Sequence, residues 1–265
     1  MTARTLSAHD PATWGPAIDE AVDVVANGGL VVLPTDTVYG IGADAFSPPA
    51  VQALLDAKGR GRQMPPPVLI GDVRTLDGLA TDVPAHARLL AEAFWPGGLT
   101  IIVRAQPSLA WDLGETHGTV ALRVPDHPAA RALLRRTGPL AVSSANRTGQ
   151  DAALSAADAY RMLGDRVRVY LDAGTSPGQV ASTIVDATTP GLRVVRQGAI
   201  SLAALNEVAP VRGTDGLLPD EVVPDESVPD ESVPDEVVPD EGVPDGAPGD
   251  PEGADRPATG DGAAG

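Results

Sequence analysis

A short apolar strand that runs into a cluster of polar side chains is the feature that most restricts how this chain can fold. Residues 30–33 have strand character, and the strand must end at Pro34 because proline cannot donate a hydrogen bond to a neighbouring strand. Residues 35–39 then supply two threonine hydroxyls, a carboxylate and a phenol. Open α/β sheets bind their ligands where strands end, so we expect a ligand site here, although a plain polar loop has the same composition.

Alternating helix and strand patterns predict an α/β fold for most of the chain. Apolar residues at helical spacing predict helices over residues 16–27, 48–57, 84–94, 127–136, 155–163 and 202–208. Apolar runs predict strands over residues 30–33, 68–70, 95–104, 118–125, 139–149, 167–171, 182–186 and 192–198. The runs over 99–103 and 120–124 have no helix between them, so we expect an open sheet of mixed parallel and antiparallel strands with flanking helices.

The C-terminal part of the chain has a different composition. Residues 218–242 are five copies of a pentapeptide of the type VPDES, and residues 215–265 carry −15 of the chain's net charge of −17. Proline at every fifth position blocks helix and sheet, and the carboxylates repel each other. We therefore predict a folded domain over 1–214 and a disordered acidic tail over 215–265. The tail would serve solvation, or alternatively would dock on a basic partner or compete with a polyanionic ligand for the protein's cations.

Several classes of protein are excluded or disfavoured by composition. The chain has no cysteine, so disulfides and thiolate chemistry are excluded, and its four scattered histidines do not predict a metal site. Residues 1–214 are left with a charge near −2, which argues against a dedicated nucleic-acid binder. The N-terminus lacks the apolar core of a signal peptide and no run is long enough to span a membrane, so we expect a cytoplasmic protein.

Cationic side chains are the candidates for ligand binding, because neither a GxxxxGK[ST] loop nor a GxGxxG fingerprint is present. The candidate cations are Lys58, Arg60, Arg123 and Arg196, and the accompanying hydroxyl and amide groups are Thr35, Ser144, Asn146 and Ser182. Lysine and arginine stabilise the charge that grows in phosphoryl or nucleotidyl transfer.

Three of these cations have simpler alternative interpretations. Lys58 and Arg60 follow the helix over 48–57, which Ser47 is placed to cap, so they could merely complement the helix dipole. Arg123 shares one strand face with Thr119 and could meet the same ligand, or it could form an ordinary ion pair at a rim. The residues alone therefore predict an anion-binding α/β enzyme or receptor.

Seven segments in order, PTDTVYGIGADA, AKGRGR, WPGGLT, ALRVPDHP, AVSSANRTG, STIVD and RQG, extend this prediction. Over roughly residues 12–208 the chain resembles the YrdC-like family of L-threonylcarbamoyladenylate synthases. The family's paired Lys-x-Arg and Ser-x-Asn motifs correspond to Lys58 and Arg60, and to Ser144 and Asn146. The resemblance implies a twisted α/β sheet with a wide concave face.

The resemblance also implies a reaction and its participants. L-Threonine, bicarbonate and ATP, with Mg²⁺ on the phosphates, would give L-threonylcarbamoyladenylate, pyrophosphate and water. A downstream transferase complex would then place the threonylcarbamoyl group on tRNA beside the anticodon. No membrane is implied, and direct binding of tRNA stays open.

Residue roles follow from the same resemblance. Lys58 and Arg60 would be catalytic. The threonine-binding residues would be Thr35, Tyr39, Arg123 and Ser182, and the nucleotide-binding residues Thr119, Ser144, Asn146 and Arg196. No protein side chain is implied as a metal ligand. One departure is Gly71, which stands where many relatives have a histidine.

Two rival functions remain open at this point. The first is an RNA- or tRNA-binding module of the same fold without synthase activity. The second is a carbamoyl-transfer domain of the kind found in hydrogenase-maturation proteins. Those proteins carry additional zinc-finger and acylphosphatase-like regions that we do not find in this sequence.

Overall fold

The computed structural model describes residues 2–219, so most of the predicted tail lies outside the described residues. The boundary predicted at residue 214 falls inside a small turn. The amide of Gly213 donates to the carbonyl of Leu217 at 2.8 Å, and the amide of Leu217 donates to Asp215 Oδ1 at 3.0 Å.

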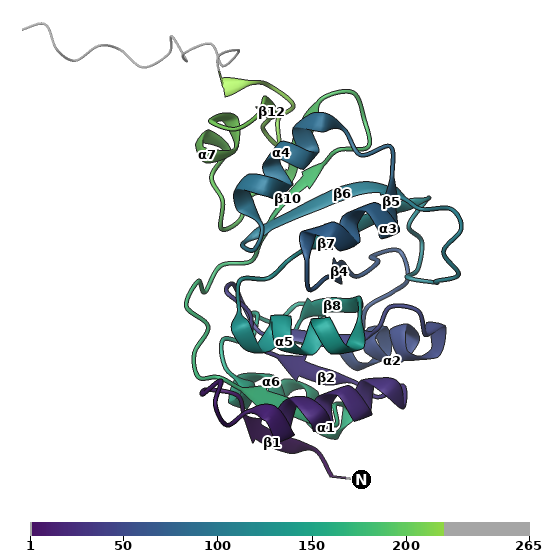
Figure 1. Cartoon of the computed structure of the whole chain (residues 1–265), viewed down its shortest axis with the longest axis vertical. Coiled ribbons are helices and arrows are strands. Elements are labelled where there is room, and N and C mark those ends of the chain that lie inside the picture. Colours follow the sequence, from purple (N-terminus) through teal and green to yellow (C-terminus); the bar gives the residue numbers. More distant parts are fainter. Residues whose placement is uncertain (1, 220–265) are drawn as a thin grey trace, which may run out of the picture. The chain divides into compact units, whose positions relative to one another are not determined.

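A mixed sheet organises residues 2–219, as the sequence predicts. The strands are β1 (Arg4–Ser7), β2 (Val31–Leu33), β3 (Gly40–Asp44), β4 (Val68–Leu69), β5 (Ala80–Thr81), β6 (Leu99–Ala105), β7 (Thr119–Arg123), β8 (Leu140–Ser144), β9 (Val169–Asp172), β10 (Thr183–Asp186), β11 (Leu192–Arg196) and β12 (Val211–Arg212). Their order is β1-β9-β2-β3-β8-β4-β7-β6-β10-β11-β12, with β5 added to β6. Figure 1 shows the strands following one another from β1 and β2 at one end to β10 and β12 at the other. Parallel pairs such as β6 with β10 and antiparallel pairs such as β6 with β7 both occur along the sheet.

Helices cover both faces of the sheet at the β2 end. The helices are α1 (Gly15–Ala26), α2 (Pro48–Lys58), α3 (Leu76–Leu79), α4 (Ala85–Phe94), α5 (Pro128–Thr137), α6 (Ala156–Leu163) and α7 (Leu202–Asn206), with 3-10 turns at Val73–Thr75 and Gly164–Arg166. Val31 and Leu33 belong to the core that α1 and α5 cover, whereas Val32 belongs to the core of α2 and α6. A strand buried on both faces is apolar throughout, which explains the uninterrupted run at residues 30–33.

The arrangement differs around β6, where the two faces of the strand have different surroundings. Leu99, Ile101 and Val103 belong to a core that includes residues of α3 and α4. Thr100 and Ile102 point to the opposite face and line a cavity. The functional candidates gather on this second face.

The predicted helices are confirmed to within a few residues, but β1 and β3 were not predicted. Residues 35–45 were expected to be a polar loop, whereas Gly40–Asp44 pair with β8, with Gly40 opposite Ser144. A side chain at Gly40 would place its Cβ 2.6 Å from Val142 Cγ1. Glycine therefore permits the close approach of β3 and β8, and it also hides the strand because it has low strand propensity.

Candidate functional site

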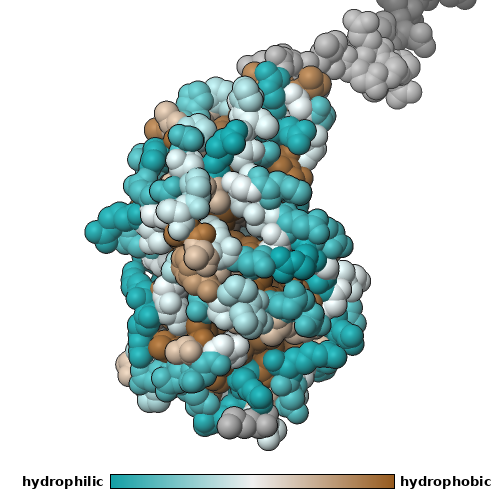
Figure 2. Space-filling view, turned by 90° about the vertical axis from the view of Figure 1, so that its right-hand side faces the viewer, coloured by the Kyte–Doolittle hydropathy of each residue, from teal (hydrophilic) through white to brown (hydrophobic). Residues whose placement is uncertain are grey.

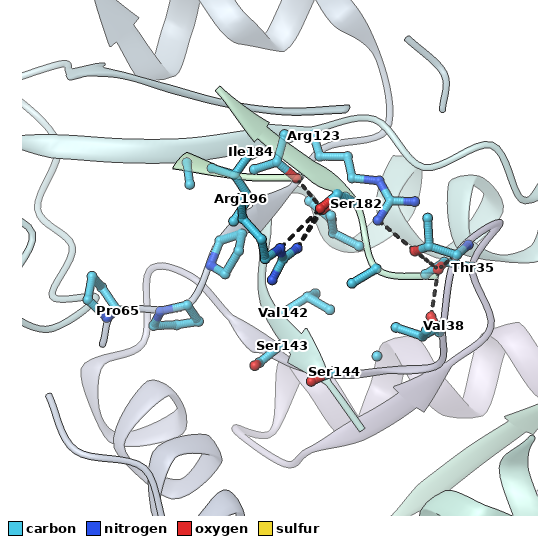
Figure 3. A pocket seen from close by; sticks show the side chains of 18 of the residues that line it. Thr35, Val38, Pro65, Arg123, Val142, Ser143, Ser144, Ser182, Ile184 and Arg196 are labelled. Carbon is cyan, nitrogen blue, oxygen red and sulfur yellow. Dashed lines mark hydrogen bonds between the residues drawn. The ribbon is translucent and has the colours of Figure 1, made fainter. Parts of the chain in front are cut away.

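A cavity of about 310 Å³ lies over the face of the sheet formed by β6, β7, β8 and β10. This volume is at the lower end of the range of small-molecule sites. Figure 3 shows Arg196 and Ser182 on one side of the cavity, with Ser143 and Ser144 across from them. The cavity lies over a sheet face, and the polar cluster at residues 35–39 forms part of its wall, because Thr35, Thr37 and Tyr39 line it.

Eight of the ten predicted site residues line this cavity: Thr35, Tyr39, Arg60, Thr119, Arg123, Ser144, Ser182 and Arg196. Lys58 and Asn146 do not line it, but both are buried and contact the strand end that carries Ser144. The fold thus brings the predicted residues together, although they come from six separate segments of the chain.

Two guanidinium groups face the cavity and have no carboxylate partner among residues 2–219. Arg60 Nε donates to the carbonyl of Met64 at 2.7 Å, and its Nη1 donates to Ser143 Oγ at 3.0 Å. Arg196 donates to the Ser182 carbonyl from Nε at 3.1 Å and from Nη2 at 2.7 Å. Burial lowers the pKa of both, and the pKa of Arg60 is lowered further by the charge of Arg196. These charges repel each other, so an anion in the cavity would relieve the repulsion.

Arg123 is the third guanidinium on this cavity, and it is already paired. Its Nη2 lies 2.5 Å from Asp36 Oδ1, its Nη1 donates to Thr37 Oγ1 at 2.9 Å and its Nε donates to the carbonyl of Gly97 at 2.8 Å. Burial lowers its pKa while Asp36 acts in the opposite direction. The ion-pair alternative for Arg123 is therefore observed, but the pair is buried in the cavity wall, and two of the five guanidinium hydrogens are not engaged by these contacts.

Lys58 joins the end of α2 to the end of β8. Its Nζ donates to the carbonyls of Ser144 and Asn146, the latter at 2.7 Å, and lies 3.4 Å from Asn146 Oδ1. Burial, followed by the nearby charge of Arg60, lowers the pKa of Lys58 to about 8. The Lys-x-Arg and Ser-x-Asn motifs are thus in direct contact, and Lys58 does more than complement the dipole of its helix. Within residues 2–219, no carboxylate lies within ion-pair distance of Lys58, Arg60 or Arg196.

The hydroxyls of Thr35 and Tyr39 are used within the protein. Thr35 Oγ1 donates to the carbonyl of Val38 at 2.6 Å and accepts from the amide of Thr37 at 3.1 Å. The phenol of Tyr39 donates to one backbone carbonyl and accepts one amide in residues 173–174, at 2.6 and 3.0 Å. Burial raises the pKa of Tyr39 to about 12, so the phenol stays protonated. Both residues shape the wall, and neither hydroxyl has a free hydrogen for a ligand.

Four polar residues that line the cavity, Thr37, Thr100, Thr116 and Ser143, were not assigned a binding role from the sequence, although Thr37 belongs to the polar cluster at residues 35–39. Thr37 and Ser143 lie next to predicted residues and hold Arg123 and Arg60, so their positions in the same short motifs could have identified them. Thr100 gave no signal because it lies inside an apolar strand. The expected pairing of Thr119 and Arg123 on one face is confirmed, since both line the cavity.

Two loops form a cover over part of the cavity. Pro65, Pro66 and Pro67 line it from the loop after α2, and Leu113 and Thr116 line it from the loop over residues 106–118.

The two loops are tied together at Arg62. Arg62 Nη2 pairs with Asp112 Oδ1 at 2.6 Å, and the amide of Glu115 donates to the Arg62 carbonyl at 2.9 Å. Phe46 stacks on Trp111 with ring centroids 5.5 Å apart.

On the face shown in Figure 2, hydrophilic residues predominate and apolar ones form small separate patches.

Gly71, the position of the family histidine, does not face the cavity. A Cβ there would lie 3.1 Å from the Arg135 amide nitrogen, so the position is packed against the backbone of α5. A histidine would require α5 to move.

The described part of the chain contains neither a cluster of metal-binding side chains nor a membrane-spanning helix. No group of three or more histidine, aspartate or glutamate side chains among residues 2–219 is arranged to hold a metal ion. None of the helices in this range is both long and apolar enough to cross a bilayer.

The chain has an open mixed α/β sheet with a cationic cavity on one face, and these features define it as an anion-binding α/β protein. Comparison with known families shows to which family of such proteins it belongs. The chain belongs to the Sua5/YciO/YrdC family, whose model, described as "Telomere recombination", matches residues 23–198.

Similar proteins in this family are named as enzymes. A protein of Mycobacterium tuberculosis strain H37Rv, which carries the provisional name threonylcarbamoyl-AMP synthase, is 53% identical over 78% of this chain and 95% of its own length. The threonylcarbamoyl-AMP synthase of Bacillus subtilis is 35% identical over 77% of this chain and 60% of its own length. Similarity at this level makes the present chain an enzyme of the family.

A solved structure supports the same assignment of the fold. The crystal structure of Pyrococcus abyssi Sua5 complexed with L-threonine has a TM-score of 0.76 and 30% identity, over 80% of this chain. The match spans 62% of the Pyrococcus chain, which is longer.

Proposed function

We propose that this chain is an L-threonylcarbamoyladenylate synthase that acts as a nucleotidyltransferase on L-threonine, bicarbonate and ATP. The observation that carries the proposal is the cavity into which Arg60 and Arg196 project with no carboxylate partner. The names of the similar proteins support the same conclusion.

The reaction joins two anions, which explains why a cationic cavity is needed. The amine of threonine and bicarbonate form a carbamate with loss of water. A carbamate oxygen then attacks the α-phosphorus of ATP, the bond from that phosphorus to the bridging oxygen breaks, and pyrophosphate leaves with the bond electrons. Arg60 and Arg196 would reduce the repulsion between the two anions and stabilise the charge that develops on the phosphoryl oxygens.

The remaining cations would bind and position the substrates. Arg123, held by Asp36 and Thr37, has two guanidinium hydrogens available for the carboxylate of threonine. Lys58 would act mainly through the Ser144–Asn146 segment, whose carbonyls it holds. Its charge adds to the positive potential of the cavity.

Magnesium would enter with ATP as part of the substrate. The site offers cations, hydroxyls and carbonyls, and its one nearby carboxylate, Asp36, is engaged by Arg123 and by the amide of Asp126. Such a set does not resemble a protein site for Mg²⁺, which prefers free carboxylates and phosphate oxygens. The phosphates of ATP would therefore supply its ligands.

The product would be a labile mixed anhydride of a carbamic acid and a phosphate. Its use requires a transferase that places the threonylcarbamoyl group on a nucleophile, and we propose adenosine of tRNA beside the anticodon as the acceptor.

Pyrophosphate release by the purified full chain tests the proposal. With MgATP, release should require both L-threonine and bicarbonate. Arg60→Ala should lower the rate by at least about a hundredfold, because Arg60 contacts the cavity directly. Arg136→Ala removes a surface arginine paired with Asp19 and serves as the matched control, which should keep the normal rate. Release that ignores threonine, or a normal rate in Arg60→Ala, would contradict the proposal.

A further inference from the structure

Thr100 places a hydroxyl on the cavity wall in the middle of an otherwise apolar strand. It is 1% exposed and lines the cavity. In the parallel pairing of β6 and β10, Thr100 lies opposite Ile184. Ser182 is two residues before Ile184 and therefore lies on the same face. Thr100 Oγ1 and Ser182 Oγ are 2.8 Å apart.

The direction of this hydrogen bond is inferred from the donors, the acceptors and the burial of the two hydroxyls. A hydroxyl has one hydrogen and two acceptor lone pairs. Within residues 2–219, Thr100 Oγ1 makes no hydrogen bond other than that with Ser182. The distance alone allows either direction, but Thr100 is 1% exposed and Ser182 7%, so the Thr100 hydrogen has fewer alternative acceptors, and we take Thr100 as the donor and Ser182 as the acceptor.

Ser182 Oγ also accepts a hydrogen bond from Arg196 Nη2, at 3.1 Å. Two donors fill both lone pairs of the Ser182 oxygen, and its own hydrogen must point elsewhere. Apart from Thr100 Oγ1, which is taken as a donor, Ser182 Oγ has no hydrogen-bond acceptor in the described part of the chain, and Ser182 lines the cavity. Figure 3 shows Arg196 reaching Ser182 at the edge of this space.

We infer that Thr100 is a positioning residue that, together with Arg196, leaves the Ser182 hydroxyl as a hydrogen-bond donor into the cavity. The acceptor is an anionic substrate oxygen, and its assignment to the carboxylate of L-threonine rests on the proposed function. Thr35, Tyr39 and Ser182 are the three hydroxyls predicted to bind threonine. The hydrogen of Thr35 goes to Val38 and that of Tyr39 to residues 173–174, so of the three only Ser182 has a hydrogen to offer.

A double-mutant cycle with Thr100→Val and Ser182→Ala tests this inference. Valine keeps the shape of threonine and removes the hydroxyl. Each single variant should raise the KM for threonine about tenfold, the loss expected for a hydrogen bond to a charged group. The double variant should show the same tenfold increase and not the product of the two, while the KM for ATP changes by less than about twofold.

Two further variants separate positioning from packing. Thr100→Ser keeps the hydroxyl and should restore the KM for threonine to within about twofold of the normal value. Thr137→Val removes a threonine hydroxyl that bonds the backbone carbonyls of Leu133 and Gly138, outside the cavity, and should change neither KM. A normal KM in Thr100→Val, or losses that multiply in the double variant, would overturn the inference.

Calorimetric titration of the unaltered chain with threonine distinguishes failure of this inference from failure of the proposed function. If the chain does not bind threonine, the proposed function is wrong. The hydrogen bond between the two hydroxyls can then still be tested by measuring the free energy of unfolding of the unaltered chain, the two single variants and the double variant. Coupled losses would support the donation from Thr100 to Ser182, and fully additive losses would overturn it.

Discussion

Lys58 is a buried cation whose charge depends on pH within the range of an ordinary enzyme assay. Burial and the charge of Arg60 lower its pKa from 10.5 to about 8. Three oxygen acceptors, on Ser144 and Asn146, surround the ammonium group and favour its charged form at neutral pH. Above pH 8 the lysine loses its proton, and the cavity loses one of its positive charges.

We therefore expect the KM for ATP to rise as the pH increases from 7 to 9. Lys58→Arg should weaken this dependence because arginine keeps its charge throughout, and steady-state kinetics of both proteins across this range provide the measurement. The contribution of Lys58 to the stability of the fold should instead become more favourable as the pH rises. Its folded pKa is below the unfolded value, so the unfolded chain binds more protons between about pH 8 and 10.5, and the free energy of unfolding rises with pH there. An unchanged KM between pH 7 and 9 would show that the charge of Lys58 does not act on the nucleotide.

At the same scale, the site residues differed in how well the sequence revealed them. Arg60 and Arg196 could be predicted because a cation beside glycines and small polar residues is unusual. The contact of Thr100 with Ser182 could not be predicted, since it becomes recognisable only when β6 and β10 are aligned. The engagement of the Thr35 hydroxyl by Val38 is also invisible in sequence because it depends on the local backbone turn.

At the scale of elements, the loop over residues 106–118 covers the cavity only because Gly114 lets it approach the loop after α2. Gly114 has a φ of +107°, and a Cβ there would lie 2.6 Å from the carbonyl oxygen of Arg62. Both the conformation and the contact exclude a side chain.

Gly114→Ala should therefore push the two loops apart. We expect the free energy of unfolding to fall by about 2–3 kcal/mol and the KM for ATP to rise, because the cover would no longer close over the cavity. Gly28→Ala is the matched control, since Gly28 has a φ of +74° but nothing within 4 Å of a Cβ. It should lose only about 1 kcal/mol, with a normal KM. Chemical denaturation and steady-state kinetics give both quantities, and equal losses in the two variants would show that the contact with Arg62 is unimportant.

Prediction of the elements succeeded where one side-chain pattern decided the structure. The Ser47 side chain accepts from the amide of Ala50 and begins α2 as expected, and the apolar run at residues 30–33 does form a strand. It failed at β3, where the glycines needed for close packing are poor strand formers. It also failed at β1, whose pairing with β9 joins segments more than 160 residues apart.

At the scale of the whole molecule, residues 2–219 contain three apolar cores that involve residues from 3 to 211. A turn over residues 212–217 follows them, where Arg212 Nη1 donates to the Gly216 carbonyl at 3.0 Å. A chain that ends at Pro219 keeps these contacts, whereas one that ends at Thr214 loses those of residues 215–217.

The chain ending at Pro219 should keep the melting temperature and the rate of pyrophosphate release of the full chain. The chain ending at Thr214 should be less stable by about 1 kcal/mol, since it loses hydrogen bonds of the final turn. Thermal melts and the activity assay on the three proteins are sufficient. A large loss of activity on removal of residues 220–265 would show that the acidic segment takes part in function.

The fold class could be predicted from the alternation of helices and strands, but the order of the strands could not. Strand β8 lies between β3 and β4, and this arrangement brings Ser144 opposite Gly40 and near the end of α2. Such long-range pairing depends on how whole elements pack, and no local pattern encodes it.

The cluster of cations on the cavity has a consequence for the enzyme between turnovers. Positive charges that repel each other attract small anions from the surroundings, and a cell contains phosphate and nucleotides in abundance. The resting protein would then hold an anion of some kind, and each catalytic cycle would begin with an exchange. Under this view phosphate or sulfate in an assay buffer acts as a competitor, and its concentration sets the apparent affinity for ATP.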